Sequence, residues 1–287
     1  MSRYYTRVCN FYYGNYAKKL IKKKKALPLS NNDYISFDQV EIISRKTKKK
    51  ILIKNINSLP NYIKKKVKKD LKIITKKKIF YNLNFKSIPN IMGILNITPD
   101  SFSDGGKYIK NNFANKQLKY LFDSGASLVD IGGESTRPGS KAVSSKVEWS
   151  RIKNILKKID KKKIISLDTR KSDIMEKGIK LGVKLINDVS GLNYDKNSIN
   201  ILKKYNTPFI LQHSLGSPDV MQIKPKYKDV LLDIYDFFEK KLKFLRKIGI
   251  NHNNIILDPG IGFGKNLKHN MIILKNISIY HSLGLPI

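Results

Sequence analysis

The chain has 287 residues, enough for one large core with a smaller appendage, which excludes a peptide-sized or disulfide-stapled fold. Cys9 is the only cysteine, so an internal disulfide is excluded and a reducing compartment is expected. No stretch of the sequence approaches the roughly 18 uncharged apolar residues of a spanning helix, and the first residues lack a signal-peptide pattern. We therefore expect a soluble, cytoplasmic protein without membrane contact.

The formal net charge is +35, and several lysine clusters could neutralise the phosphates of a nucleic acid. Lys, Asn and Ile are in excess everywhere in the chain, however, which indicates a general codon bias acting on solvated surfaces. Nucleic-acid binding is therefore not the expected purpose of the charge.

The amino-terminal part, residues 1–86, differs in composition from the rest of the chain. It carries a net charge of +20 and one glycine, whereas residues 87–287 carry +15 and sixteen glycines. Alternating apolar residues predict strands over 33–44 and 48–56, and Ile63, Val67, Leu71 and Ile74 recur at helical spacing. We predict a domain edge near Ser87, with a lysine-rich, mixed α/β extension before it.

From residue 87 onward, apolar runs alternate with helix-length amphipathic stretches. The expected strands lie within 90–98, 127–135, 163–169, 184–191, 208–214 and 255–260, and the expected helices are near 111–124, 146–159, 172–182, 197–205, 228–248 and 267–282. Such alternation predicts a parallel sheet covered by helices. Six successive units favour a (β/α)8 TIM-type barrel, of which about six β/α units are present, although the spacing alone also allows an open doubly wound sheet.

Each apolar run ends in polar residues that could bind a ligand. They are Asn96, Asp130, Asp168, Asn187 with Asp188, Gln212 with His213, and Asp258. The carboxyl ends of parallel strands lie on one rim, so these side chains should converge. A single Asp after a strand could instead cap the following helix, but capping does not explain the amides.

The residue types at this rim indicate a ligand with two chemically different ends. The oxygens of Asp168, Asn187 and Asp258 suit a flat heterocycle that presents N–H donors. The loop 134–140 adds Thr136 and Arg137, and the loop 258–265 adds three glycines and Lys265, which suit a phosphate group. The four scattered histidines form no metal cage, whereas a Mg²⁺ held mainly by ligand phosphates and one protein oxygen is compatible with the sequence.

Several long motifs in the barrel region resemble those of the dihydropteroate synthase family. They are MGILNITPDSFSDGG (92–106), VDIGGESTRPG (129–139), SLDTRK (166–171), INDVSG (186–191), the MQ-to-DV segment (221–230) and Leu257 with DPGIGFGKN (258–266). The match runs from about residue 88 to the last residue.

The resemblance implies a transferase of folate biosynthesis that uses Mg²⁺. It would condense 6-hydroxymethyl-7,8-dihydropterin diphosphate with p-aminobenzoate to give 7,8-dihydropteroate and diphosphate. Asp168, Asn187 and Asp258 match residues that hold the pterin ring, and Asn96 matches the ligand of the Mg²⁺–diphosphate group.

The resemblance also implies roles for two loops and an oligomeric state. Thr136 and Arg137 match a loop that closes over the site and shapes the p-aminobenzoate pocket along with Pro138 and Phe263. Arg137 would also stabilise the leaving group. Asp130 and Lys265 are further rim residues. The full-length form is implied to be a homodimer.

The chain departs from the family pattern in three places. Residues 1–86 lie outside the core match, and LQHS (211–214) alters one wall of the pterin pocket. The segment SLGLPI (282–287) has the pattern of a helix end followed by a seventh strand, and the Ser-Arg-Lys and Arg-x-His motifs of the later family strands do not occur. We therefore expect a barrel that is incomplete at its carboxy terminus.

Two other hypotheses stay open at this point. A pterin-binding methyltransferase would share the barrel and the ring-binding positions, although the 92–106 and 129–139 motifs favour the synthase. A catalytically inactive truncated paralogue could instead use its basic amino-terminal region to bind RNA or an acidic partner.

Overall fold

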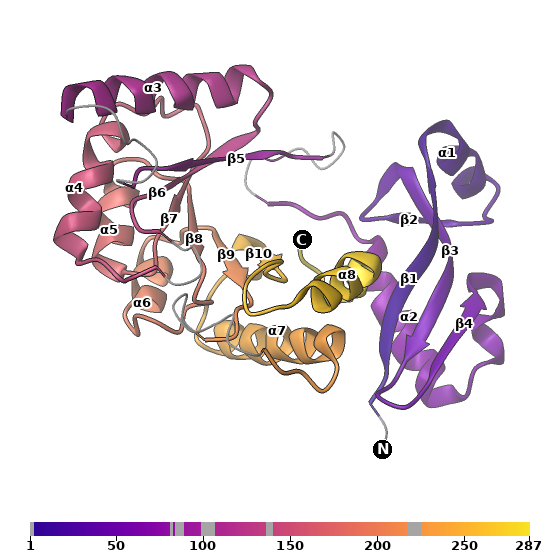
Figure 1. Cartoon of the computed structure of the whole chain (residues 1–287). Helices are drawn as coiled ribbons and strands as arrows, with labels where there is room; N and C mark the ends of the chain where they lie inside the picture. Colours follow the sequence, from indigo (N-terminus) through magenta and orange to yellow (C-terminus); the bar gives the residue numbers. More distant parts are fainter. Residues whose placement is uncertain (1–2, 81–82, 84–88, 99–106, 136–139, 217–224) are drawn as a thin grey trace.

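The structure is a computed structural model that describes residues 3–80, 83, 89–98, 107–135, 140–216 and 225–287. Its described residues form two sheets, one at the amino terminus and one in the body of the chain (Figure 1). The first sheet is antiparallel and the second is parallel.

The amino-terminal sheet is built on one long central strand. Strand β3 (Asn32–Ile43) pairs antiparallel with β1 (Tyr5–Tyr13), β2 (Leu27–Leu29) and β4 (Lys48–Leu52). Helices α1 (Gly14–Lys22) and α2 (Asn61–Thr75) accompany it, with the 3₁₀ helix η1 (Ile53–Ser58) between β4 and α2. Val67, Leu71 and Ile74 on the apolar side of α2 pack with residues of β1 and β3 in a hydrophobic core that is separate from the main one.

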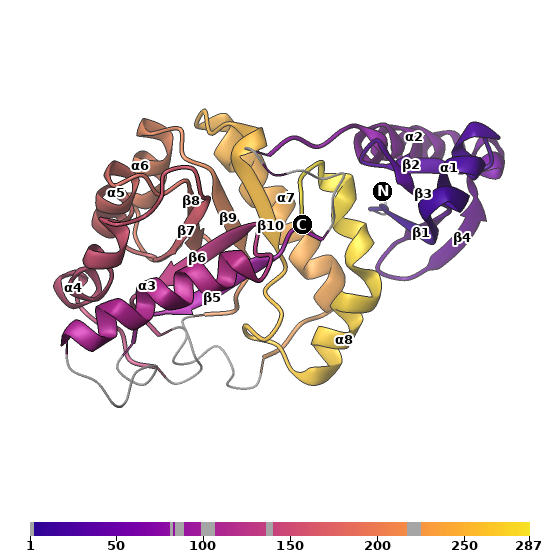
Figure 2. The ribbon, with the colours of Figure 1, turned by 90° about the horizontal axis from the view of Figure 1, so that it is seen from above.

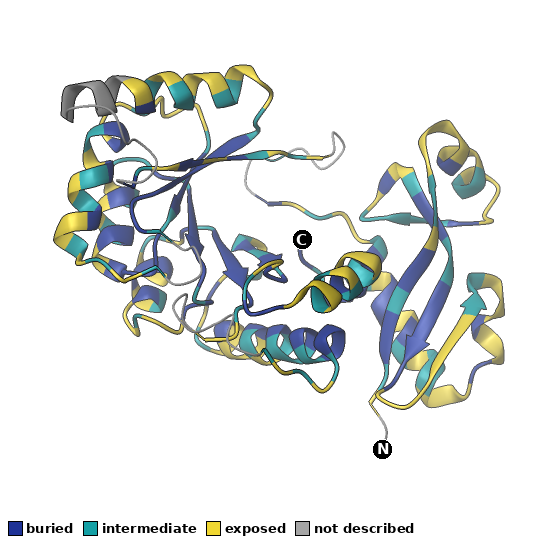
Figure 3. Ribbon diagram, in the orientation of Figure 1, coloured by how far each residue is buried: buried dark blue, intermediate teal, exposed yellow. Residues whose placement is uncertain are grey.

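Six parallel strands follow in chain order across the second sheet. They are β5 (Met92–Asn96), β6 (Leu128–Gly132), β7 (Ile165–Asp168), β8 (Leu185–Asp188), β9 (Phe209–Gln212) and β10 (Ile255–Asp258). Every residue of β6, β8 and β9 is buried, as expected of central strands in a parallel sheet that is covered on both faces (Figure 3).

Helices connect these strands and cover the outer face of the sheet (Figure 2). They are α3 (Lys107–Asp123), α4 (Ser145–Leu156), α5 (Ser172–Lys180), α6 (Ser198–Lys204), α7 (Val230–Lys247) and α8 (Leu267–Asn276). Several begin at a side-chain cap: Ser144 for α4, Asp229 for α7, and a capping box of Asn266 and His269 for α8. The α/β barrel architecture expected from the sequence is confirmed, with six β/α units among the described residues.

Most of the expected helices and all six expected barrel strands occur near their predicted positions. The helix expected over 267–282 is α-helical only to Asn276 and continues as the 3₁₀ helix η4 (Ile277–Leu283). In the extension, the strand expected over 48–56 stops at Leu52, and Ile53–Ser58 is helical instead. Strand β1 and helix α1 were not predicted.

The segment that follows η4 lies beside the edge of the parallel sheet. Gly284 ends η4 with a φ of 88°, a conformation that favours glycine. The backbone N–H of Leu257 in β10 then donates to the carbonyl of Pro286 at 2.9 Å. The apolar run at 282–287 therefore occupies the position expected of a seventh strand.

The amino-terminal sheet docks onto α7 and η4 of the barrel. Tyr5 is 1% exposed, packs edge-on against Tyr235 with ring centroids 5.1 Å apart, and donates to Asp236 at 2.8 Å. Arg45 forms ion pairs of 2.7 Å with both Asp233 and Asp236. Tyr5 and Ile43 belong to the main hydrophobic cluster, so the core continues across the predicted boundary near Ser87.

Within the described ranges, no helix combines the length and the apolar character needed to cross a membrane.

Replacing Tyr5 by Ala should lower the free energy of unfolding by roughly 3–5 kcal/mol, because a buried ring and its contact with Tyr235 are lost. Urea denaturation followed by circular dichroism measures the change. Tyr13→Ala is the matched control, since Tyr13 lies in the same strand but is 66% exposed. Equal losses in the two variants would contradict the docking described above.

Candidate active site

The register of the parallel sheet places four residues in one row. Asn96 of β5 is aligned with Gly132 of β6, Gly132 with Asp168 of β7, and Asp168 with Asn187 of β8. Aligned residues in a parallel sheet point to the same face. The side chains of Asn96, Asp168 and Asn187 therefore share one face at the carboxyl ends of their strands.

Gly132 is the gap in this row that lets its neighbours approach one another. A Cβ atom on Gly132 would lie 3.0 Å from Oδ1 of Asn96 and 3.4 Å from Oδ2 of Asp168. Two oxygen acceptors from different strands thus lie on either side of a position without a side chain. The sequence points to Asn96 and Asp168 but not to the need for glycine between them.

Asn187 is held by Asp130 in a single orientation. Its Nδ2 donates to Oδ2 of Asp130 at 2.8 Å, and both residues are buried. Its Oδ1 has no hydrogen-bond partner among the described residues. A buried acceptor without a partner is costly, so this oxygen is suited to an N–H donor of a ligand.

The protonation state of the Asp168 carboxyl group depends on such donors. Burial and the neighbouring carboxylates of Asp130 and Glu148 raise its pKa well above the ordinary value. Hydrogen bonds from ligand N–H groups would favour the ionised form and oppose this shift. Among the described residues no side chain donates to Asp168, which leaves its oxygens available.

Gln212 and Asp258 extend the same surface onto β9 and β10. Ile210 is aligned with Asn187, and Gln212, two residues further along β9, points to the same face and is aligned with Asp258. Nε2 of Gln212 is buried without a partner in the described part of the chain, so it offers a donor next to the acceptors. Burial raises the pKa of Asp258, whose Oδ1 accepts the backbone N–H of Gly260 at 2.7 Å.

Lys265 stabilises the loop after β10 through hydrogen bonds of its ammonium group. Its three hydrogens reach Nδ1 of His213, the carbonyl of His213 and the carbonyl of Phe263, at 3.2, 3.2 and 2.8 Å. Burial lowers the pKa of Lys265 to about 8 and that of His213 to about 3, so His213 is neutral. Gly260 is required in this loop, because at its φ of 68° a Cβ would lie 2.0 Å from the carbonyl oxygen of His213.

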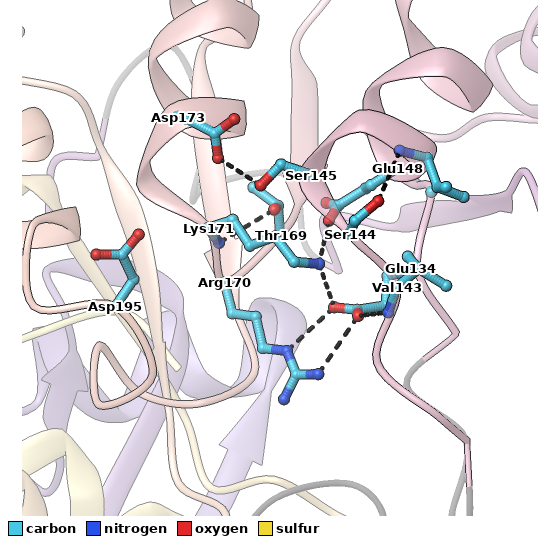
Figure 4. A network of polar contacts seen from close by, with 12 residues as sticks. Glu134, Val143, Ser144, Ser145, Glu148, Thr169, Arg170, Lys171, Asp173 and Asp195 are labelled. Carbon is cyan, nitrogen blue, oxygen red and sulfur yellow. Dashed lines mark hydrogen bonds and ion pairs between the residues drawn. The ribbon is translucent and has the colours of Figure 1, made fainter.

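A buried ionic network supports the rim beside Asp168 (Figure 4). Glu134 accepts from Nε of Arg170 at 3.0 Å and pairs with Nζ of Lys171 at 3.0 Å, while Lys171 also pairs with Glu148 at 2.5 Å. Burial would raise the pKa of Glu134, but these partners and the N–H of Val143 lower it. Arg170 and Lys171 follow β7 by two and three residues, so the network ties residues 134 and 143 to the strand that carries Asp168.

Sequence reasoning missed this network. The available signal was that Glu134 follows β6 by two residues and Arg170 follows β7 by two, which places opposite charges on neighbouring strand ends. Asp188, in contrast, has a structural role in its own turn. Its Oδ1 accepts hydrogen bonds from the backbone N–H and the hydroxyl of Ser190.

Not all of the predicted site residues can be placed. Thr136, Arg137 and Pro138 lie outside the described residues. Phe263 lies in a turn in which its N–H donates to the carbonyl of Gly260 at 3.0 Å. Asn96, Asp168, Asn187 and Asp258 lie at the carboxyl ends of their strands, and Lys265 lies in the loop after β10. The prediction that Asp130 ends its strand is wrong, because β6 continues to Gly132 and Asp130 lies in its middle.

The site offers an amide oxygen, and no cluster of charged ligands among the described residues, to a metal ion. No group of three His, Cys, Asp or Glu side chains is arranged to hold a metal within the described ranges. Oδ1 of Asn96 is a single hard oxygen at the rim, which fits a Mg²⁺ that takes most of its ligands from phosphates and water.

Comparisons with known proteins agree with this geometry. The family described as pterin binding enzyme matches residues 92–287. A dihydropteroate synthase from Clostridium beijerinckii is 42% identical over 199 residues, which cover 69% of this chain and 71% of that protein.

Solved structures give the same result. Dihydropteroate synthase from Clostridium difficile, crystallised with pteroic acid, is 39% identical with a TM-score of 0.65, over 71% of this chain and 76% of that one. The Xanthomonas albilineans enzyme with 4-aminobenzoic acid is 34% identical with a TM-score of 0.64, over 69% and 71% of the two chains. The family match over more than half of the residues and the 42% identical relative establish that this chain belongs to the dihydropteroate synthase family of pterin-binding enzymes.

Proposed function

We propose that the chain condenses 6-hydroxymethyl-7,8-dihydropterin diphosphate with p-aminobenzoate, giving 7,8-dihydropteroate and diphosphate in folate biosynthesis. The observation that carries the proposal is the row of Asn96, Asp168 and Asn187, in which Asp130 leaves Oδ1 of Asn187 free for a ligand donor. Relatives crystallised with pteroic acid and with 4-aminobenzoic acid support the same substrates.

The pterin ring would lie against the buried polar row. Asp168, Asp258 and Oδ1 of Asn187 would accept hydrogen bonds from the amino and ring N–H groups, and Nε2 of Gln212 would donate to an acceptor on the ring. A carboxylate out of water stays ionised only with such donors, so ring binding and ionisation of Asp168 support each other.

The reaction needs little acid–base chemistry from the protein. The C–O bond to diphosphate breaks with its electron pair on the leaving group, and the dihydropterin shares the positive charge left on the methylene carbon. The amine nitrogen of p-aminobenzoate then forms the new C–N bond and loses one proton. Positioning of the two reactants is therefore the main contribution of the protein.

Diphosphate departure requires compensating positive charge. Mg²⁺, when bound, supplies charge stabilisation to the leaving group, and Asn96 would provide its protein ligand. Thr136 and Arg137 would contact the diphosphate side, and Pro138 and Phe263 would border p-aminobenzoate, as the sequence motif implies. The network around Glu134 would hold the two ends of that loop segment.

The proposal extends to the setting of the enzyme. We place it in the cytoplasm, with small-molecule substrates and a second copy of the chain as its partners.

Asp168→Ala should weaken binding of the pterin diphosphate by at least about 100-fold, because two acceptors for ring donors are lost. Isothermal titration calorimetry measures the affinity. Asp173→Ala, an exposed position in the following helix, is the control and should bind normally. Unchanged affinity in Asp168→Ala would show that the ring is held elsewhere.

Gly132→Ala should reduce pterin diphosphate affinity by about tenfold, because the new methyl group pushes Asn96 and Asp168 apart. The same titration measures it. Gly93→Ala is a matched control in the neighbouring strand, since its Cβ meets only the side chain of Leu121, 3.2 Å away. Equal affinities in the two variants would contradict the proposal that the pterin ring binds at the row of Asn96, Gly132 and Asp168.

Arg137→Ala should lower kcat by roughly 10²–10³ with much less change in pterin diphosphate binding, because its charge acts mainly on the departing diphosphate. Diphosphate release after addition of p-aminobenzoate measures turnover. Lys141→Ala removes a nearby exposed charge as the control. A loss confined to binding would contradict this role, and methyl transfer from methyltetrahydrofolate without diphosphate release would favour a methyltransferase.

A further inference from the structure

A second pocket lies at the opposite end of the barrel from the candidate active site. It has a volume of about 420 Å³ and is formed by the end of α2 with the residues after it, the end of α7, the 3₁₀ helix η3 (His252–Asn254) and the segment after η4. Since η3 precedes β10 whereas Asp258 ends it, the pocket and the polar row are separated by the length of the strand.

The lining of this pocket divides into two chemical halves. Its apolar side is formed by Ile73, Ile79, Leu283, Leu285 and Pro286. Its cationic side is formed by Lys76, Lys77, Lys78 and Arg246, and no acidic residue lines the pocket. None of these four cations forms an ion pair within the described part of the chain.

The polar groups of the pocket are oriented as donors. Nε of Arg246 donates to Nδ1 of His252 at 3.2 Å, which leaves Nε2 of His252 as an N–H donor and the terminal nitrogens of Arg246 without a described partner. Lys78 is half-buried, and its Nζ donates to the carbonyl of Ile73 at 2.6 Å. Burial, Arg246 and Lys78 lower the pKa of His252 to about 4, as expected where positive charge is not compensated.

The lysine-rich composition alone does not account for this arrangement. A pocket of equal volume in the amino-terminal region also has three lysines, Lys24, Lys25 and Lys54, but there Asp38 faces them. The barrel-side pocket instead combines uncompensated cations, a neutral donor and an apolar wall. Its volume is in the range of small-molecule sites.

We propose that this pocket binds a phosphate-bearing small molecule of the nucleotide class, with its phosphates on the lysines and Arg246 and its ring against the apolar wall. Such a ligand would connect the chain after α2 with α7 and stabilise the docked amino-terminal region. The proposal is independent of the synthase reaction, because none of these residues lies at the carboxyl ends of the strands.

The test titrates ATP and inorganic triphosphate separately into the 287-residue chain at physiological salt, using isothermal titration calorimetry. ATP should bind more tightly than triphosphate, and the double variant K77Q/R246Q should bind ATP at least about tenfold more weakly. The double variant K24Q/K54Q removes two charges from the other pocket and should bind like the parent. Synthase activity should be unchanged in both variants.

Four results of the ATP titrations would overturn the proposal, and so would stronger competition by an oligonucleotide. They are absence of ATP binding, equal affinity for ATP and triphosphate, equal weakening in the two double variants, and ATP binding that persists in K77Q/R246Q and is displaced by the pterin diphosphate. The last outcome would assign the bound nucleotide to the barrel site. A single-stranded oligonucleotide that competes more strongly than ATP would assign the charge to nucleic acid instead.

Discussion

The register of the parallel sheet is the constraint on which the site depends. It fixes Asn96, Gly132, Asp168 and Asn187 at one level, so that groups from four separate strands face the same space. No local sequence feature could bring three polar side chains this close in a dry environment. Asn187 is buried, and Asp168 is partly buried, so these two members of the row lose hydration that specific partners must compensate.

The described protein groups satisfy the polar row only in part. Asp130 accepts a hydrogen bond from Nδ2 of Asn187, whereas Oδ1 of Asn187 has no partner among the described residues. Asp168 lies near the carboxylates of Asp130 and Glu148, which carry the same charge. Around this row, two charged arrangements are complete: Glu134 with Arg170 and Lys171, and Lys265 with its three acceptors. The first arrangement consists of ion pairs and the second of hydrogen bonds from a lysine, and both lie in segments that border the row.

Much of this architecture could be predicted from the sequence, because apolar runs that alternate with amphipathic helices leave a strong periodic signal. The rim residues Asn96, Asp168 and Asn187 were predictable for the same reason, since each ends such a run. Strand β1 was not, because its pairing with β3 is long-range and its aromatic, partly polar sequence carries no clear alternation. The network of Glu134 was also hidden, since its partners are 36 and 37 residues away and only the strand order brings them together.

The packing of the barrel depends in part on the amino-terminal sheet that docks onto it. Tyr5 completes the packing around Tyr235, and Ser278 donates its hydroxyl hydrogen to the carbonyl of Val8 at 2.7 Å. A barrel separated from residues 1–86 would expose an aromatic patch on α7 beside Asp233 and Asp236, both deprived of their arginine partner. The extension thus completes the packing of α7 and η4, so a change on the facing surface of α7 is also a change in how residues 1–86 are held.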